Sequence, residues 1–172
     1  PQILILCPSR ELAEQIYYNF GELNKYLKFK GLLLIGGKSI EDNIRELENG
    51  VQVIIGTPGR VYDMMRRGNI TTKTIKLVIL DEADEMLSQG FKEQVYNIFQ
   101  YFDNDIQVAL FSATLPMNIY KITDQFMRNP VKISVAAEML TLEGIKQYFV
   151  ALNDDVEKYA TLKDIYKVIS LS

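Results

Sequence analysis

Three acidic side chains follow a short apolar run and have the types and spacing of a phosphoryl-transfer site. The run Leu77–Leu80 leads directly into Asp81 and Glu82, and Asp84 follows two residues later. In such sites the first acid holds Mg²⁺, usually through water, and the second orients or deprotonates the attacking water. Acidic residues are also favoured at helix N-termini, so an acidic helix cap is the alternative. This segment alone leaves both interpretations open.

Two hydroxyl residues follow the next apolar run and could join the acidic group. Ser112 and Thr114 come directly after residues 108–111. If the two runs are neighbouring strands, both hydroxyls come within hydrogen-bonding reach of Asp84 from the adjacent loop. The spacing therefore predicts a connection between the acidic site and its neighbour.

Two further segments combine a hydroxyl, an expected helix start and an arginine. They are Pro8–Glu11 and Thr57–Arg60. Backbone N–H groups at helix starts bind phosphate, so such a pair suits phosphates spaced along a nucleic-acid strand. Either segment alone is explained more simply by helix capping with a solvated arginine. Two of them beside Gly36 and Gly37, which allow close approach to the backbone, favour the nucleic-acid interpretation.

The segment Gly36–Ser39 imitates the end of a P-loop. That motif requires G-x-x-x-x-G-K-[ST], which places a first glycine at position 32. Leu32 stands there, and residues 32–35 are apolar strand material. We therefore predict that this segment is not the phosphate loop.

Short continuous apolar runs alternate with amphipathic runs and define the elements that position these residues. Continuous runs indicate strands buried on both faces, as in a parallel sheet covered by helices. Ligands of such α/β folds bind at the carboxyl ends of the strands, where all the segments above lie. The predicted strands are Ile3–Cys7, Gly31–Ile35, Val51–Ile55, Leu77–Leu80, Val108–Phe111 and Val131–Val135.

The stretches between the strands have helical spacing and recognisable ends. Ser9, Ser39 and Thr57 are expected N-caps, and Gly50 and Gly68 are expected to end their helices. One face of the first helix is predicted to be apolar throughout, with Leu12, Ile16, Phe20, Leu23 and Leu27. Beyond residue 135 the pattern changes to a linker at 136–144, a strand at 145–152 and a helix at 156–169.

The composition excludes several classes of chemistry. The 172 residues include no histidine, which rules out histidine bases, histidine metal ligands and Ser-His-Asp triads. The single cysteine, Cys7, is predicted to be a buried, unreactive thiol. With a formal net charge of -3 and a pI near 5.1, nucleic-acid contact must be local. No apolar run reaches membrane-spanning length, so we expect an intracellular setting, in cytoplasm or nucleus, without membrane contact.

Five segments occur in the order and approximate spacing found in the DEAD-box ATP-dependent RNA helicases, which the chain resembles over its full length. They are Pro8-Ser9-Arg10-Glu11-Leu12-Ala13, Gly36-Gly37, Thr57-Pro58-Gly59-Arg60, Asp81-Glu82-Ala83-Asp84 and Ser112-Ala113-Thr114. Residues 81–92 and 141–145 are most similar to the initiation-factor-4A branch, which includes the exon-junction helicase. One departure is Ser9, where the family usually has threonine.

The resemblance implies a role for each matching residue. Asp81 would hold Mg²⁺, Glu82 would position the hydrolytic water, and both would face ATP. Asp84 would act through Ser112 and Thr114 to couple hydrolysis to unwinding. Sequence-independent contacts with the RNA sugar-phosphate backbone would come from Pro8, Ser9, Arg10, Gly36, Gly37, Thr57, Pro58, Gly59 and Arg60.

The resemblance also implies how the chain is divided and what it lacks. Residues 1–135 would form most of a three-layer RecA-like α/β domain, 136–144 a linker, and 145–172 the start of a second RecA-like domain. The P-loop would precede residue 1 and the arginine finger would follow residue 172. We therefore expect a fragment that is inactive as an ATPase on its own.

Three functions follow from this interpretation. The first is an ATP-dependent RNA helicase that couples ATP hydrolysis to local duplex unwinding. The alternative is an ATP-locked RNA clamp or scaffold with little turnover, with partner proteins of translation-initiation or exon-junction type. A scaffold without a nucleotide site is disfavoured, because it has no chemical need for the acidic and hydroxyl residues described above.

Overall fold

The chain forms two compact units, Pro1–Pro130 and Val131–Ser172, which are described separately. The structure is a computed structural model, and it describes residues 1–88, 90–103, 105–114, 123, 125–134, 144–146, 148–152 and 154–169. The first unit ends at Pro130, close to the predicted end of the first domain at residue 135. The predicted division into 1–135, 136–144 and 145–172 stays a prediction.

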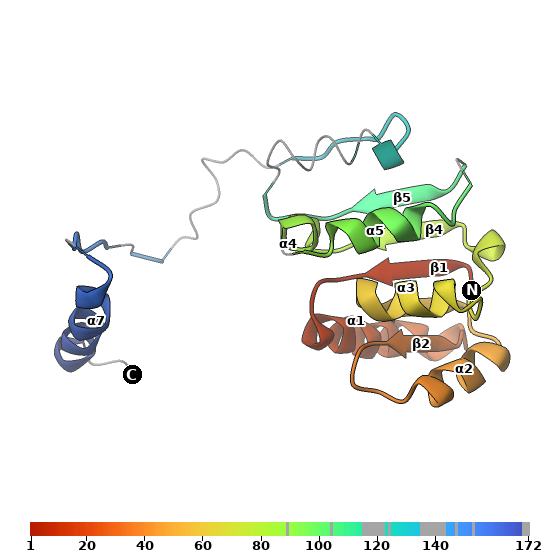
Figure 1. The fold of residues 1–172 in the computed structure, drawn as a ribbon, viewed down its shortest axis with the longest axis horizontal. Helices are drawn as coiled ribbons and strands as arrows, with labels where there is room; N and C mark the ends of the chain where they lie inside the picture. Colours follow the sequence, from red (N-terminus) through yellow and green to blue (C-terminus); the bar gives the residue numbers. More distant parts are fainter. Residues whose placement is uncertain are drawn as a thin grey trace. The chain divides into compact units, whose positions relative to one another are not determined.

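The first unit contains a five-stranded parallel sheet with the order β2-β3-β1-β4-β5 (Figure 1). The register aligns Leu6 with Gly56 and Leu80, and it aligns Gly56 with Leu34 and Leu80 with Leu110. All five carboxyl ends therefore lie along one edge of the sheet. The strands are β1 Ile3–Leu6, β2 Gly31–Leu34, β3 Val53–Gly56, β4 Leu77–Leu80 and β5 Gln107–Leu110.

The helices begin and end close to where the sequence predicts. The Ser9 hydroxyl accepts a hydrogen bond from the Leu12 N–H at 3.1 Å, and the Ser39 hydroxyl accepts one from the Asp42 N–H at 3.1 Å. The predicted caps at Ser9 and Ser39 are confirmed, and Thr57 occupies the N-cap position of α3 but makes no side-chain cap hydrogen bond. Gly50 and Gly68 follow their helices at φ values of +79° and +76°. The helices of this unit are α1 Arg10–Leu23, α2 Ile40–Glu48, α3 Pro58–Arg66, α4 Ala83–Ser88 and α5 Lys92–Phe99, with 3₁₀ turns η1 Asn24–Tyr26 and η2 Thr72–Thr74.

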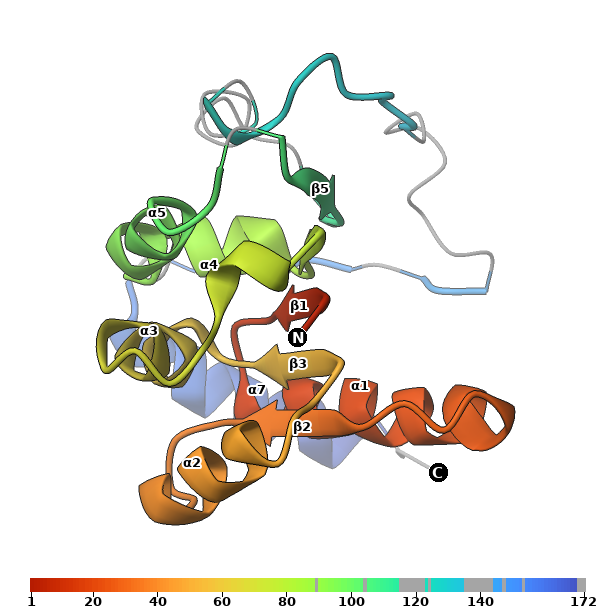
Figure 2. The same ribbon diagram turned by 90° about the vertical axis from the view of Figure 1, so that its right-hand side faces the viewer.

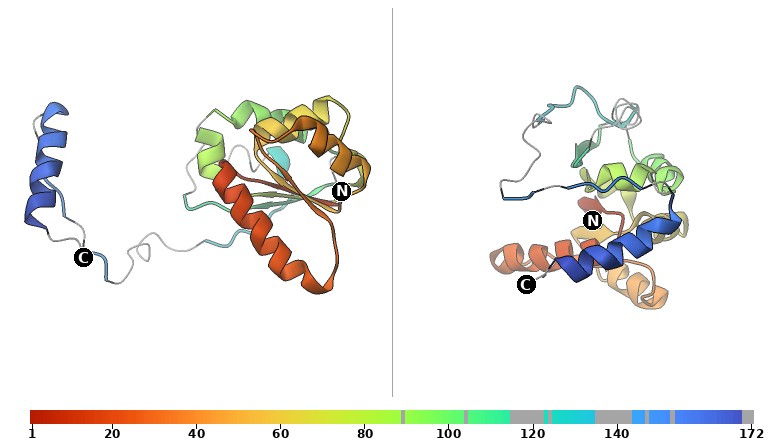
Figure 3. Two further views of the ribbon diagram at one scale, coloured as in Figure 1. Left: turned by 90° about the horizontal axis from the view of Figure 1, so that it is seen from below. Right: turned by 90° about the vertical axis from the view of Figure 1, so that its left-hand side faces the viewer.

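The sheet is the middle of three layers. Helix α1 covers one face, and α2, α3, α4 and α5 cover the other (Figures 2 and 3). Under α1, the strand residues Leu33 and Ile55 pack with Ile16 and Phe20. The second core is larger, and its fully buried side chains include Leu4, Leu34, Ile54, Met64, Leu80 and Ile98. The predicted α/β class with a buried parallel sheet is confirmed.

The predicted apolar face of the first helix is wrong at its far end. Leu23 and Leu27 are 80% and 63% exposed. The reason is that α1 ends at Leu23 and the chain continues into the 3₁₀ turn η1. The α-helix therefore ends before Leu27, and helical spacing no longer places this residue on the buried face.

Two predicted strands in the last quarter of the chain are not formed within the described residues. Residues 131–134, 144–146 and 148–152 belong to no strand, and Val131, Ile133 and Phe149 are about nine-tenths exposed. A strand is stable only beside another strand that satisfies its N–H and C=O groups. Among the described residues, these segments form no strand ladder with a neighbouring strand, so the apolar pattern alone does not produce strands.

The predicted last helix is confirmed as α7, Val156–Val168. Leu162 on this helix and Ile169, which follows it, are each about half exposed. No helix in the described part of the chain has both the length and the apolar character needed to cross a membrane.

Candidate active site and nucleic-acid interface

The acidic segment leaves the sheet between two neighbouring strands. Asp81 follows the end of β4, and its N–H donates to the Leu6 carbonyl of β1 at 2.9 Å. The Glu82 N–H donates to Oδ1 of Asp81 at 3.0 Å. Glu82 has a φ of +50°, in the left-handed region that costs a side-chain-bearing residue about 1–2 kcal/mol. Such strained residues concentrate at functional sites, and this one turns the chain sharply at the strand end.

The local charges change the proton affinity of two groups at this strand end. Loss of surrounding water, followed by the negative charges of Glu85 and Asp81, raises the pKa of Glu82. A carboxylate with a raised pKa is a better proton acceptor. Burial, followed by the charges of Asp81 and Glu82, raises the pKa of Cys7 to about 12. The Cys7 thiol is fully buried, which confirms its predicted burial, and the raised pKa agrees with the prediction that it is unreactive.

Asp84 connects this strand end to the next one. The Thr114 hydroxyl and N–H both donate to Oδ2 of Asp84, at 2.7 and 3.1 Å. The Asp84 N–H donates to the Ser112 hydroxyl at 3.3 Å, and that hydroxyl donates to the Thr114 carbonyl at 2.6 Å. These hydrogen bonds, led by the Thr114 hydroxyl, lower the pKa of Asp84. The predicted contact of Asp84 with Ser112 and Thr114 is confirmed.

The acidic residues fit a magnesium ion only in part. Within the described residues, no three carboxylate, cysteine or histidine side chains are grouped as metal ligands. Asp81 offers one carboxylate at the strand end. Mg²⁺ in phosphate-handling sites is typically held by one or two carboxylates together with substrate phosphates and water. Asp81 therefore suits an ion that phosphates share, and the predicted role of Asp81 stays a prediction.

Arg10 lies over the glycine pair at the end of β2. A Cβ atom placed on Gly36 would be 2.9 Å from Nη2 of Arg10, and one placed on Gly37 would be 3.2 Å from Nη1. Gly37 also has a φ of +86°, which favours glycine. The close approach that the glycines were expected to allow is thus made by the Arg10 guanidinium. Two segments predicted separately from the sequence form one surface.

Arg60 joins the third segment to the same turn. Its Nη2 donates to the Lys38 carbonyl at 2.9 Å, and its Nη1 donates to Oδ1 of Asn43 at 2.6 Å. Asn43 lies on α2 and is 4% exposed. Sequence reasoning missed Asn43, although its position three residues after Ile40 and four before Leu47 places it on the apolar face of the helix.

The remaining predicted RNA-contacting residues differ in exposure. Pro8, Thr57 and Pro58 are buried, and the structure uses them to begin α1 and α3. Ser9 is half-buried and caps α1. The exposed members are Arg10, Gly37 and Gly59, with Gly36 and Arg60 half-buried. A ligand on this edge therefore meets arginine and glycine backbone more than hydroxyl side chains.

Gln94 is a second residue that sequence reasoning did not identify, and it lies beneath the start of α3. Gln94 on α5 has a buried side-chain oxygen that accepts no hydrogen bond from the described residues. This oxygen lies 3.8 Å from a Cβ atom placed on Gly59. This is an ordinary van der Waals distance, so a small side chain at position 59 would fit beside Gln94.

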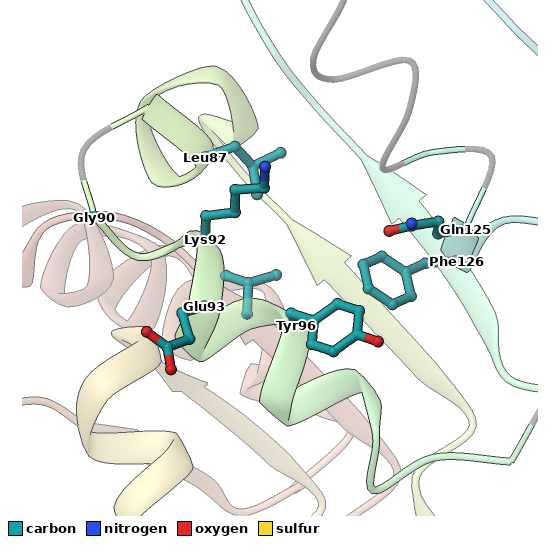
Figure 4. Close-up of a pocket in the computed structure, with 8 residues that line it drawn as sticks. Leu87, Gly90, Lys92, Glu93, Tyr96, Gln125 and Phe126 are labelled. Carbon is teal, nitrogen blue, oxygen red and sulfur yellow. The ribbon is translucent and has the colours of Figure 1, made fainter.

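A separate pocket of about 410 Å³ is lined by residues other than Asp81, Glu82 and Asp84 (Figure 4). The rings of Tyr96 on α5 and Phe126 lie side by side at one wall of it, with centroids 5.9 Å apart, and Phe126 also stacks on Phe99 at 4.2 Å. The remaining lining residues are Leu87, Gly90, Lys92, Glu93, Val95 and Gln125. None of the residues predicted for catalysis or RNA contact lines this pocket.

The chain is similar in sequence to known helicases and initiation factors. The sequence profile of the family described as DEAD/DEAH box helicase matches residues 1–122. Eukaryotic initiation factor 4A-3 of Nicotiana plumbaginifolia is 50% identical over 171 residues, which cover 99% of this chain and 44% of that protein. Eukaryotic initiation factor 4A of Caenorhabditis elegans is 46% identical over 171 residues, which cover 99% of this chain and 42% of that protein. The chain thus spans less than half the length of these curated relatives.

Solved structures show the same likeness in three dimensions. Dbp5 of S. cerevisiae, bound to RNA and ADP BeF3, matches with a TM-score of 0.81 at 31% identity, covering 98% of this chain and 42% of that chain. A DEAD box protein of the hyperthermophile Methanococcus jannaschii matches with a TM-score of 0.72 at 38% identity, covering 74% of this chain and 35% of that chain. The parallel sheet, the ordered segments along its edge and these similarities agree: the chain belongs to the DEAD/DEAH box helicase family, and its α/β fold is RecA-like.

Proposed function

We propose that this chain supplies the hydrolytic acids and part of the RNA-binding surface of an ATP-dependent RNA helicase. The observation that supports this most strongly is the hydrogen-bonded bridge between Asp84 and Thr114. The bridge joins the strand end that carries Asp81 and Glu82 to the end of β5. A change at the acids during hydrolysis is therefore passed directly to a second segment of the site.

The acidic residues divide the hydrolytic work between them. Glu82, whose pKa is raised, orients the attacking water and accepts its proton. Asp81 would hold Mg²⁺ beside it. The positive charge of the ion would offset the negative charge of the ATP phosphates. Asp84 is already committed to Ser112 and Thr114 and acts on coupling rather than on the water.

The arginine and glycine segments bind the RNA backbone without reading its bases. Arg10, Gly37 and Gly59 are exposed along one edge and offer positive charge and open backbone. Contacts of this kind position a nucleic acid but carry no sequence information. The match to a Dbp5 structure bound to RNA and ADP BeF3 supports both ligands.

The test is RNA-dependent ATP turnover in the full-length protein. A helicase hydrolyses many ATP molecules per protein when RNA is added and separates a short duplex. An ATP-locked clamp, the alternative, forms a long-lived RNA complex and releases about one phosphate or fewer per protein. RNA affinity that does not respond to ATP, together with ATPase activity that does not respond to RNA, would overturn the proposal. The proposal also includes an intracellular location and partner proteins of translation-initiation or exon-junction type.

A further inference from the structure

We propose that Asn43 is a positioning residue for the RNA-binding edge. It holds the Arg60 guanidinium, and Arg60 in turn holds the Gly36–Ser39 turn. We call Asn43, Arg60 and the Lys38 carbonyl the brace. This inference rests on the proposed RNA-binding function of the edge.

The brace connects three separate stretches of the chain through one planar group. Asn43 comes from α2, Lys38 from the turn before it and Arg60 from the first turn of α3. The two hydrogen bonds of 2.6 and 2.9 Å use two of the five N–H donors of the guanidinium. Because the guanidinium is planar and rigid, its two contacts fix the turn and the helix start at one separation.

Burial makes the Asn43 contact specific. Asn43 is 4% exposed, and a buried amide without a partner is costly. A hydrogen bond to a charged donor is also stronger than one between neutral groups. The Arg60 side chain is therefore held by α2 from beneath, while its remaining N–H groups stay available at the surface.

Besides the Ser39 cap at its end, the turn has one weaker side-chain tie among the described residues. Nζ of Lys38 lies 3.9 Å from Oε1 of Glu14, and both side chains are about half exposed. Ion pairs of this kind contribute little in water. The turn also contains Gly37 at a φ of +86° and lies against the Arg10 guanidinium. Loss of the brace would therefore release the turn and, with it, the surface on which Arg10 rests.

A positioning role and a direct phosphate contact predict different salt dependence. For single-stranded nucleic acid, log affinity falls linearly with log salt, and each phosphate contact makes this salt slope steeper by roughly 0.7. Asn43 carries no charge and is buried, so its loss weakens binding without changing this slope. Loss of a phosphate-contacting arginine makes the salt slope shallower and also lowers the affinity.

The experiment compares Asn43→Leu, Asn43→Asp and Asn49→Leu in the full-length protein with fluorescent single-stranded RNA. We expect Asn43→Leu to bind about tenfold more weakly at unchanged salt slope, as for loss of a hydrogen bond to a charged group. Asn43→Asp keeps the acceptor oxygen and should stay within about twofold of wild type. Asn49→Leu is the matched control, the same change at an exposed position at the end of the same helix.

Hydrogen exchange supplies a readout that needs no RNA. Asn43→Leu and Arg60→Ala should each speed amide exchange in residues 36–39, and the double variant should exchange no faster than either single variant. Wild-type RNA affinity in Asn43→Leu, a slope lowered as much as by Arg10→Ala, or additive exchange rates would overturn the inference. A wild-type protein that binds no RNA would overturn the proposed function, whereas the exchange rates would still decide whether the brace exists.

Discussion

The Thr114 hydroxyl donates a 2.7 Å hydrogen bond to Oδ2 of Asp84, across 30 positions of the sequence. The Thr114 N–H donates to the same oxygen at 3.1 Å. The carboxyl ends of the neighbouring strands β4 and β5 are thereby joined through the Asp84 side chain, in addition to the backbone hydrogen bonds of the sheet. The segment that carries Glu82 cannot shift without disturbing Thr114.

This bridge has a measurable effect on acid titration. Because the hydrogen bonds from Thr114 and Ser112 favour the ionised form, the pKa of Asp84 lies below its ordinary value. The bridge therefore stabilises the fold above the ordinary aspartate pKa of about 3.9, and this contribution is lost as pH falls through the lower folded-state pKa. Carboxyl NMR titration should show a higher Asp84 pKa in Thr114→Val than in wild type.

The matched control for this titration is Thr71→Val, the same change at an exposed threonine before η2. It should leave the Asp84 titration unchanged. An Asp84 pKa that is equal in wild type and Thr114→Val would show that the Thr114 hydroxyl does not stabilise the carboxylate.

A single methyl group should displace Arg10 from the glycine pair. The Cβ atom of Gly36→Ala would lie 2.9 Å from Nη2 of Arg10, which is the movable end of a long side chain. We expect Arg10 to swing away, so RNA affinity and salt slope fall while the midpoint of thermal unfolding changes little. Gly21→Ala is the control, because its Cβ meets nothing within 4 Å and alanine favours the helix. Unchanged RNA binding in Gly36→Ala would separate Arg10 from the RNA surface.

The chain by itself should not bind ATP tightly. Tight binding of ATP phosphates by a P-loop requires a wrapped loop of N–H donors and a lysine, and no segment of the sequence fits G-x-x-x-x-G-K-[ST]. In the one partial match, the Lys38 carbonyl is bound by Arg60 and the Lys38 amine lies near Glu14. Equilibrium binding of labelled ATP with Mg²⁺ to the 172-residue chain should find no micromolar affinity. A micromolar dissociation constant that Lys38→Ala abolishes would make this turn the phosphate loop.

Much of the fold and the acidic group could be predicted because their signals are local. Continuous apolar runs mark strands buried on both faces, and Ser9 and Ser39 mark helix starts through bonds to residues only three positions away. The Asp84 bridge was predictable because parallel strands place their carboxyl ends side by side. The strands expected at 131–135 and 145–152 are not formed within the described residues. Their apolar sequences were misleading, because a strand also depends on a neighbouring strand that its own sequence does not reveal.

The brace was not predicted, because it depends on side chains that meet only after three segments have packed. Arg60 was expected to face solvent and RNA, and nothing in its own segment indicates Asn43 as a partner. A signal was present in α2, where an asparagine occupies a position that helical spacing assigns to the apolar face. A polar residue at such a position needs a buried partner, and the sequence could have directed attention there.

The most direct test of the whole account is the steady-state ATPase of Glu82→Gln in the full-length protein with saturating RNA. Glutamine keeps the size of the side chain but cannot accept the proton, so the rate should fall on the order of 10²–10⁴-fold. Affinities for ATP and RNA should stay within about twofold of wild type, and Glu48→Gln on the exposed end of α2 should hydrolyse normally. An unchanged ATPase rate in Glu82→Gln would contradict the assignment of this strand end as the hydrolytic site.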